Sequence, residues 1–317
     1  MSVFSEPISW LRESINSILL QTFSDFEFII VNDNPARTEN DLLLEEYKQK
    51  DKRILVIRNK QNIGLTKSLN AGLKIAKGIY IARMDADDVA LPERFEKQVY
   101  YMNTHLDVIV LGTNIKYIGD VPFMTLSDWI KQEDRAIKAQ MLFNSGFAHS
   151  TVMIRKSVLS EKNICYDVEY KQSQDYRLWE VLYDLGKFAN LPDKLLLYRL
   201  SNLQISKKAN AKQVNYGRMI SRRLISKWIC RIEGCSYTTY TSKSEVWKLK
   251  RNIKSKIKST DPIFYEAFIR TLYFSQDNSR ILFFFRSLVN GDFFSFSFLN
   301  KLRYLFILLH LKKTVIW

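Results

Sequence analysis

The first 111 residues alternate short, almost wholly apolar runs with segments of helical periodicity, and this alternation constrains the fold more than any other feature. The apolar runs are residues 27–31, 54–57, 79–82 and 108–111. Nearly continuous apolar runs are typical of strands buried on both faces of a sheet. Ahead of the first run, Leu11, Ile15 and Ile18 share one face of a predicted helix. Strands that alternate with helices predict an α/β fold with a mainly parallel sheet.

Acidic residues follow two of these predicted strands. Asp33 comes after the first apolar run, and Asp85, Asp87 and Asp88 come after the third. Parallel sheets bind ligands at the carboxyl ends of their strands. Three carboxylates within four residues repel one another unless a cation lies among them, and oxygen ligands suit Mg²⁺ or Mn²⁺ with positions left for a diphosphate. A metal–diphosphate loop is the favoured interpretation, and a solvated turn in which Asp88 caps the next helix is the alternative.

Two further candidates lie in the less regular stretch 113–206. His149 precedes an apolar strand at 151–154. A lone histidine at a strand edge is more often structural, so binding is the less favoured of its two interpretations. Asp175 stands at the start of a predicted helix, where a carboxylate either caps the helix or acts as a base in a cleft. Residue order leaves both roles of Asp175 open.

Charge is distributed unevenly along the chain. The net charge is +15, and residues 207–258 alone hold 15 Lys and Arg against two Glu, while residues 1–206 are nearly neutral. We therefore expect the chemistry in the front of the chain and contact with an anionic partner at the rear. Nucleic acid and the inner face of the cell membrane are the two candidates.

The basic rear opens with a predicted amphipathic helix. Ile220, Leu224 and Trp228 fall at helical spacing, with Arg222 and Arg231 among the interleaved basic residues. A basic amphipathic helix with Trp is typical of membrane-surface binding, and the alternative is a helix that packs its apolar side on the catalytic domain. The aromatic tail beyond residue 283 has uncharged runs shorter than the ~20 residues a spanning helix needs. We expect the tail to lie in the membrane interface without crossing it.

Composition excludes several classes of protein. The three cysteines, Cys165, Cys230 and Cys235, do not make a disulfide framework, which favours a reducing cytosol. Three histidines argue against a zinc site of Cys and His ligands. The chain has neither a Gly-x-Gly-x-x-Gly dinucleotide motif nor a phosphate-loop Gly-Lys-Ser/Thr.

Five stretches of the chain resemble, in order and spacing, the motifs of bacterial family 2 glycosyltransferases. They are residues 16–33, 62–72, 82–95, 149–153 and 174–179. The resemblance implies a GT-A catalytic domain at 1–206, followed by a basic, mainly helical region at 207–317. It implies an inverting hexosyl- or N-acetylhexosaminyltransferase that uses a nucleotide-sugar donor, with UDP the nucleotide favoured. The acceptor implied is a hydroxyl of a glycan or lipid-linked sugar in capsule or O-antigen biosynthesis.

The resemblance also assigns roles to five residues. It implies that Asp33 contacts the base of the donor nucleotide, that Asp85 contacts its ribose or the metal shell, and that Asp87 binds Mn²⁺ or Mg²⁺ directly. It implies that His149 lines the cleft between donor and acceptor. Asp175 is then the general base that takes the proton from the acceptor hydroxyl. One base opposite the leaving diphosphate gives inversion in a single displacement.

Three positions depart from the family pattern. The chain begins at residues that match the end of the family's first strand, so we expect a weakened donor pocket. Gln174 replaces the Glu that often precedes the catalytic Asp. Ser201 stands where many relatives have a histidine that could bind the metal, which puts the metal shell in question.

Two other functions are compatible with parts of the sequence. A sugar-nucleotide pyrophosphorylase also uses acidic strand ends, but the chain has no N-terminal Gly-rich phosphate loop for it. A catalytically impaired transferase-like scaffold that binds membrane or nucleic acid is favoured by the basic rear and opposed by the intact Asp85, Asp87 and Asp175. We expect a peripheral enzyme on the cytoplasmic face of the cell membrane, and we do not expect nucleic acid as a partner.

Overall fold

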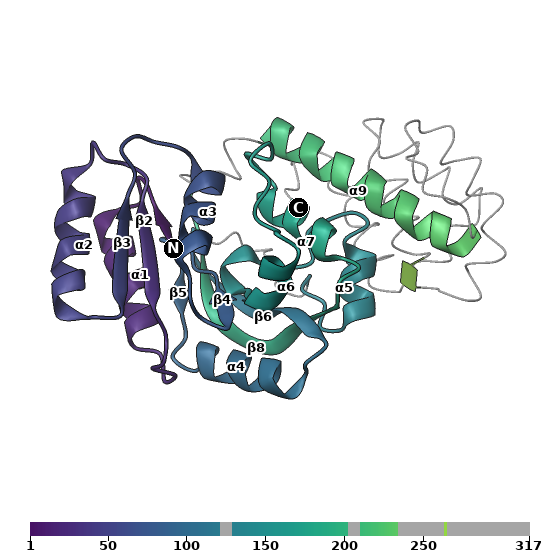
Figure 1. Cartoon of the computed structure of the whole chain (residues 1–317), viewed down its shortest axis with the longest axis horizontal. Helices are drawn as coiled ribbons and strands as arrows, with labels where there is room; N and C mark the ends of the chain where they lie inside the picture. The colour runs from purple at the N-terminus through teal and green to yellow at the C-terminus, as the bar shows by residue number, and fades with distance from the viewer. Residues whose placement is uncertain (121–128, 202–209, 234–262, 265–317) are drawn as a thin grey trace. The chain divides into compact units, whose positions relative to one another are not determined.

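The computed structural model describes residues 1–120, 129–201, 210–233 and 263–264 (Figure 1). The chain divides into two compact units, Met1–Ile220 and Ser221–Trp317. The domain boundary predicted after residue 206 lies outside the described residues, and so does the aromatic tail beyond residue 283.

A three-stranded parallel sheet opens the first unit. Its strands are β1 (Ser2–Val3), β2 (Phe28–Asn32) and β3 (Ile54–Arg58), in the order β1-β2-β3. The connecting helices are α1 (Ile8–Leu19) and α2 (Thr38–Lys50), with α2 beside β3 in Figure 1. The predicted apolar face of α1 is confirmed, since Leu11, Ile15 and Ile18 are buried.

The strand predicted to be short is the two-residue β1. It pairs with β2 through the Val31 amide, which donates to the Met1 carbonyl at 2.9 Å, and the Asp33 amide, which donates to the Val3 carbonyl at 2.9 Å. These hydrogen bonds fix the end of β2 immediately before the Asp33 side chain.

A five-stranded sheet follows, in the order β4-β7-β6-β8-β5. The strands are β4 (Tyr80–Ala82), β5 (Val89–Ala90), β6 (Val108–Gly119), β7 (Met153–Arg155) and β8 (Lys187–Leu200). The pair β6–β8 is parallel, whereas β7 runs antiparallel to both β4 and β6, and β5 runs antiparallel to β8. The parallel arrangement predicted from the sequence therefore holds for the first sheet, and the second is mixed.

The remaining helices connect and follow these strands. They are α3 (Leu65–Ile75), α4 (Arg94–Thr104), α5 (Asp134–Gln140), the 3₁₀ turn η1 (His149–Thr151), α6 (Lys156–Glu161), α7 (Gln174–Leu182) and α9 (Asn210–Glu233). Gly64 precedes α3 with a φ of 84°, a left-handed conformation that favours glycine.

The predicted basic helix is present as the second half of α9. Ile220, Leu224, Ile225 and Trp228 are buried. Arg222 is exposed. Within the described ranges, no helix is both long and apolar enough to cross a membrane.

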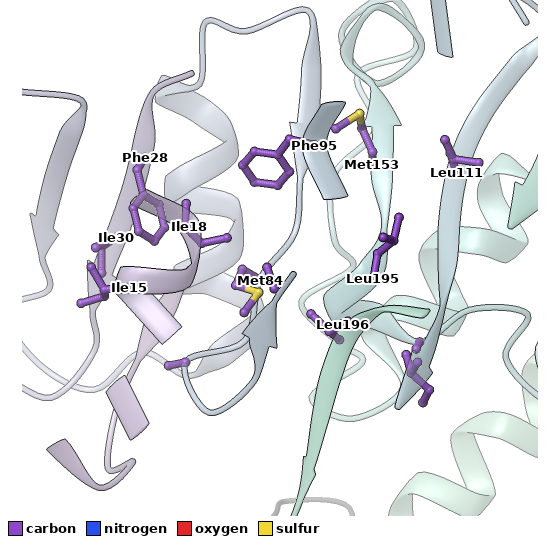
Figure 2. Close-up of a cluster of buried hydrophobic side chains, with 14 of the residues drawn as sticks. Ile15, Ile18, Phe28, Ile30, Met84, Phe95, Leu111, Met153, Leu195 and Leu196 are labelled. Carbon is purple, nitrogen blue, oxygen red and sulfur yellow. The ribbon is translucent and has the colours of Figure 1, made fainter. Parts of the chain in front are cut away.

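The hydrophobic core of the first unit runs from one sheet to the other (Figure 2). Ile15, Ile18, Phe28 and Ile30 contribute from α1 and β2, and Met153, Leu195 and Leu196 contribute from β7 and β8. Met84 lies among these side chains, in the loop between β4 and β5. The core therefore holds the acidic loop from its inner side.

Candidate active site

The acidic loop Arg83–Asp88 is anchored by alternate residues. Met84 and Ala86 are buried in the core, at 3% and 2% exposure, whereas Asp85 and Asp87 are only partly buried. From α1, the Ser14 hydroxyl donates to the Asp85 carbonyl at 2.8 Å. Burial of the apolar residues therefore stabilises a loop that leaves two carboxylates accessible.

Asp85 forms an ion pair with Arg83. Its Oδ1 accepts a hydrogen bond from Arg83 Nη2, and its Oδ2 accepts one from the Ser150 hydroxyl of η1. Burial acts to raise the pKa of Asp85, but the charge of Arg83 and the Ser150 hydrogen bond hold it below its ordinary value. Asp85 is therefore ionised at neutral pH and has both oxygens already engaged.

Asp87 and Asp88 have the opposite electrostatic environment. Burial, followed by the charges of Asp85 and Glu6, raises the pKa of Asp87 to about 7. Burial and the two neighbouring carboxylates raise the pKa of Asp88 well above its ordinary value. The Oδ2 of Asp88 is buried without a hydrogen-bond partner. Negative charge is thus crowded at the end of the loop, as expected where a cation binds.

Arg199 of β8 holds this end of the loop. Its backbone amide donates to Asp88 Oδ1 at 2.8 Å, and its Nε donates to the Asp87 carbonyl at 2.7 Å. Its guanidinium also pairs with Glu13 and lies 4.8 Å from the centre of the Trp10 ring. The cap position of α4 is Glu93, so the alternative in which Asp88 caps the next helix is wrong.

His149 and Tyr166 form a neutral pair beside the acidic loop. His149 Nε2 lies 2.8 Å from the Tyr166 hydroxyl. Burial, followed by the charge of Arg83, lowers the pKa of His149 to about 3. Burial raises the pKa of Tyr166. Both side chains are therefore uncharged at neutral pH.

Asp175 lies in the first turn of α7, and the cap position is Ser173. Burial raises the pKa of Asp175, against the opposing effects of nearby backbone N–H groups and the Arg83 charge. The charges of Arg83 and Asp85 both act on Asp175, so helix α7 brings this carboxyl to the same region as the acidic loop. A partly buried carboxylate whose pKa is raised suits proton abstraction.

Asp33 belongs to a different hydrogen-bond network. Its Oδ1 accepts from Asn59 Nδ2 at 2.8 Å and from the Ile63 amide at 2.9 Å, and its Oδ2 accepts from the Gly64 amide at 2.8 Å. The carboxylate therefore fixes the turn that begins α3. Its predicted contact with the nucleotide base stays a prediction.

Of the predicted residues, the structure gathers Asp85, Asp87, His149 and Asp175 around Arg83. Sequence reasoning assigned no role to four residues that build this region: Arg83, Ser150, Tyr166 and Arg199. Arg83 and Ser150 stand inside motifs that carried the resemblance, and Arg199 stands two residues before Ser201, so position along the chain was a usable signal for these three. Tyr166 lies outside every motif, and nothing in the sequence marks it.

The fit of a divalent cation can be judged from the acidic loop. Among the residues that the structure describes, no three His, Cys, Asp or Glu side chains form a ready-made metal site. Mg²⁺ is commonly bound by one or two carboxylates together with substrate phosphates and water. Asp87, whose charge its neighbours disfavour, and the unpartnered Asp88 Oδ2 fit a site of that partial kind. Ser201, where a histidine ligand is common, is buried immediately after β8.

Comparison with known proteins places this site in a family. Residues 1–162 match the family model "Glycosyl transferase family 2". A glycosyltransferase of Methanocaldococcus jannaschii is 34% identical over 272 residues, which cover 85% of each chain. The O-antigen biosynthesis glycosyltransferase WbnJ of Escherichia coli is 36% identical over 207 residues, 62% of this chain and 77% of WbnJ. The crystal structure of S. aureus TarS 1–349 in complex with UDP-GlcNAc has a TM-score of 0.59 at 17% identity, over 86% of this chain and 80% of that one.

The fold and these relatives define a glycosyltransferase with a GT-A catalytic unit. More particularly, the chain belongs to glycosyl transferase family 2. The match to the family model ends before Asp175, so the role of that residue rests on its own environment and on the motif that contains it.

Proposed function

We propose that this enzyme transfers a sugar from a UDP-sugar, with inversion, to a hydroxyl group of a glycan or lipid-linked acceptor in bacterial surface-polysaccharide assembly. The observation that carries the proposal is that Asp175 lies close enough to the acidic loop for the charges of Arg83 and Asp85 to act on it. Burial raises the pKa of this carboxyl group. The donor class is supported by TarS, which has been crystallised with UDP-GlcNAc, and the process by WbnJ, an enzyme of O-antigen biosynthesis.

In this mechanism Asp175 is the general base. Its carboxylate accepts the proton of the acceptor hydroxyl while the oxygen forms a bond to the anomeric carbon and the diphosphate leaves from the opposite face. Because burial raises the pKa of Asp175, the carboxylate is a stronger base than an exposed aspartate. The neutral His149–Tyr166 pair lines the same region without adding a competing charge.

The acidic loop is where Mg²⁺ or Mn²⁺ fits. Asp87 would hold the cation, and Arg199 keeps the loop in place through the Asp87 carbonyl and the Asp88 carboxylate. The chemistry supplied by a bound cation is neutralisation of the charge that develops on the leaving diphosphate. Asp85 stays paired with Arg83 and so contributes a fixed negative charge.

We further propose that the enzyme works on the inner face of the cell membrane. Residues 207–258 carry 15 Lys and Arg against two Glu, and basic segments of this kind are attracted to anionic lipids by about 1 kcal/mol per charge. Since Leu224 and Trp228 are buried, this contact rests on charge. Co-sedimentation with phosphatidylglycerol vesicles should fall as salt rises, and equal binding to neutral phosphatidylcholine vesicles would contradict it.

Calorimetric titration of UDP into the full chain, with and without Mn²⁺, tests the donor class. We expect binding that depends on the metal. A panel of UDP-sugars then identifies the donor by release of UDP. Absence of UDP binding under both conditions, with the protein folded by circular dichroism, would reject the UDP-sugar proposal.

A further inference from the structure

The segment 166–173 leads from α6 to α7 and ends two residues before Asp175. Its first residue, Tyr166, contacts His149 in the candidate active site. The placement of Asp175 therefore depends on what holds this segment, because it is irregular and has no sheet partners.

Helix α3 holds the segment from one side. Asn70 Nδ2 donates to the Tyr166 carbonyl at 2.8 Å, and the Tyr166 amide donates to Asn70 Oδ1 at 2.9 Å. One turn earlier, the Thr66 hydroxyl donates to the Tyr170 carbonyl at 3.2 Å. Thr66 and Asn70 are four residues apart and so share one face of α3.

The first turns of α9 hold the segment from another side. The Tyr216 hydroxyl donates to the Glu169 carbonyl at 3.0 Å, and the Tyr216 ring lies 4.9 Å from that of Tyr170, centre to centre. The Ser173 hydroxyl donates to the Gln213 carbonyl at 3.3 Å. Gln213 and Tyr216 are three residues apart and share one face of α9.

The backbone at the end of the segment is in an uncommon conformation. Ser173 has a φ of 59°, in the left-handed region that non-glycine residues rarely adopt. Such a conformation persists where the surrounding structure enforces it. The Ser173 side chain contacts α9 through Gln213, and Asp175 follows two residues later.

We propose that Tyr216 is a positioning residue, and that the first turns of α9 hold segment 166–173 against α3 and thereby fix the Asp175 carboxyl. This inference rests on the proposed role of Asp175 as general base. Helix α9 then contributes to catalysis in addition to the proposed membrane contact. The helix that continues into the basic region is then part of what orients the base.

Three variants of the full chain test the proposal. Tyr216→Ala removes both the ring contact and the hydrogen bond, and Tyr216→Phe removes only the hydrogen bond. Val214→Ala is the matched control, since Val214 is an exposed α9 residue at 41% exposure. The measurements are kcat for UDP release from the UDP-sugar that the wild type turns over, the Kd of UDP with Mn²⁺, and hydrogen exchange of the amides in 166–173.

We expect Tyr216→Ala to lower kcat by about 10- to 100-fold, since small misplacements of a catalytic group have effects of that size. The Kd of UDP should stay unchanged within error, and exchange in 166–173 should become faster. Tyr216→Phe should show the same changes to a smaller extent, and Val214→Ala none. A loss of UDP affinity equal to the loss of kcat would indicate general unfolding and would overturn the positioning role.

Asp175→Asn, measured beside these variants, separates the two proposals. If Asp175→Asn is inactive while Tyr216→Ala keeps wild-type kcat and exchange, the positioning role is wrong and the proposed function stands. If Asp175→Asn is as active as the wild type, the base assignment fails. The exchange of 166–173 in Tyr216→Ala, which removes both the ring contact and the hydrogen bond, then still decides whether α9 holds the segment.

Discussion

Two strands of the catalytic unit are followed by aspartates, and the two carboxyl groups meet opposite environments. Asp33, after β2, is buried and accepts three hydrogen bonds, two of them from the backbone of the turn before α3. Asp87, after β4, lies among other carboxylates, and burial together with the charges of Asp85 and Glu6 raises its pKa to about 7. The oxygens of Asp33 have hydrogen-bond partners within the protein. The negative charge of Asp87 is unfavourable in its surroundings unless a ligand neutralises it.

The difference shows how aspartates that follow strands of two different sheets can have opposite environments. Two backbone N–H groups donate to the Asp33 carboxylate, which thereby holds the turn before α3. At Asp87 burial and then the neighbouring acids raise the pKa, which costs stability but favours a cation. The following predictions test this contrast, together with the role of Asp175.

The largest effect is expected at Asp175. Asp175→Asn should lower kcat for sugar transfer by about 100- to 10,000-fold, the range attributed to general-base catalysis. UDP binding should be unchanged, because the substitution leaves the acidic loop intact. Asp25→Asn, at an exposed aspartate, is the control. Full transfer by Asp175→Asn would show that another group accepts the proton.

The next effect concerns the cation. Asp87→Ala should weaken UDP binding in Mn²⁺ by about 100-fold, the scale seen when groups that support a metal site are removed. Binding without metal should hardly change, because the substitution leaves Asp33 and its turn intact. Calorimetry in Mn²⁺ and in EDTA measures both. Equal losses under the two conditions would assign Asp87 to the nucleotide instead of the metal.

Stability should separate the two strand ends directly. Asp33→Asn should lower the free energy of unfolding by about 2 kcal/mol. The NH₂ group of Asn would face an N–H group from which the carboxylate now accepts a hydrogen bond. Asp87→Asn should raise it by about 1 kcal/mol by removing one of several crowded charges. Urea unfolding measures both, with Asp25→Asn as the control. If Asp33→Asn is as stable as the wild type, Asp33 does not act through its turn.

The smallest effect is a pH dependence at His149. Burial lowers its pKa from 6.5 to about 3 in the folded chain, so its contribution to stability is present above pH 6.5 and is lost as the pH falls toward 3. Between pH 7.5 and 5.5 the wild type should lose about 1 kcal/mol more than His149→Gln, in which an amide replaces the imidazole beside Tyr166. Urea unfolding at the two pH values gives the difference. If both proteins lost the same free energy of unfolding between the two pH values, a group other than His149 would be responsible for the acid sensitivity.

Much of the front half of the fold could be predicted from the sequence because its signals are local. The apolar runs at 27–31 and 54–57 became β2 and β3, and the periodic segment around Leu11 became α1. The order and direction of the second sheet could not be predicted, since β7 inserts between β4 and β6 with antiparallel pairing. The direction of those strands is set by contacts between segments that are distant in the sequence. Such contacts produce no periodic pattern of residues along the chain.

The candidate site divides in the same way. Asp85, Asp87 and Asp175 stand in motifs with recognisable spacing, so the sequence located them. Tyr166 was missed because its partners, His149 and Asn70, lie 17 and 96 residues away along the chain. The helical spacing of the α9 apolar residues could not specify that Leu224 and Trp228 are buried.

By itself, the sequence determined the alternation of strands and helices, the family, and the acidic residues that end two strands, because periodicity and motifs are properties of neighbouring residues. Only the tertiary structure decided which of those acids is satisfied and which is crowded. Hydrogen bonding and desolvation depend on groups brought together from distant segments, such as Arg199, 111 residues from the Asp88 carboxylate to which its amide donates. The same carboxyl group therefore holds a turn after β2 and lies among other carboxylates after β4.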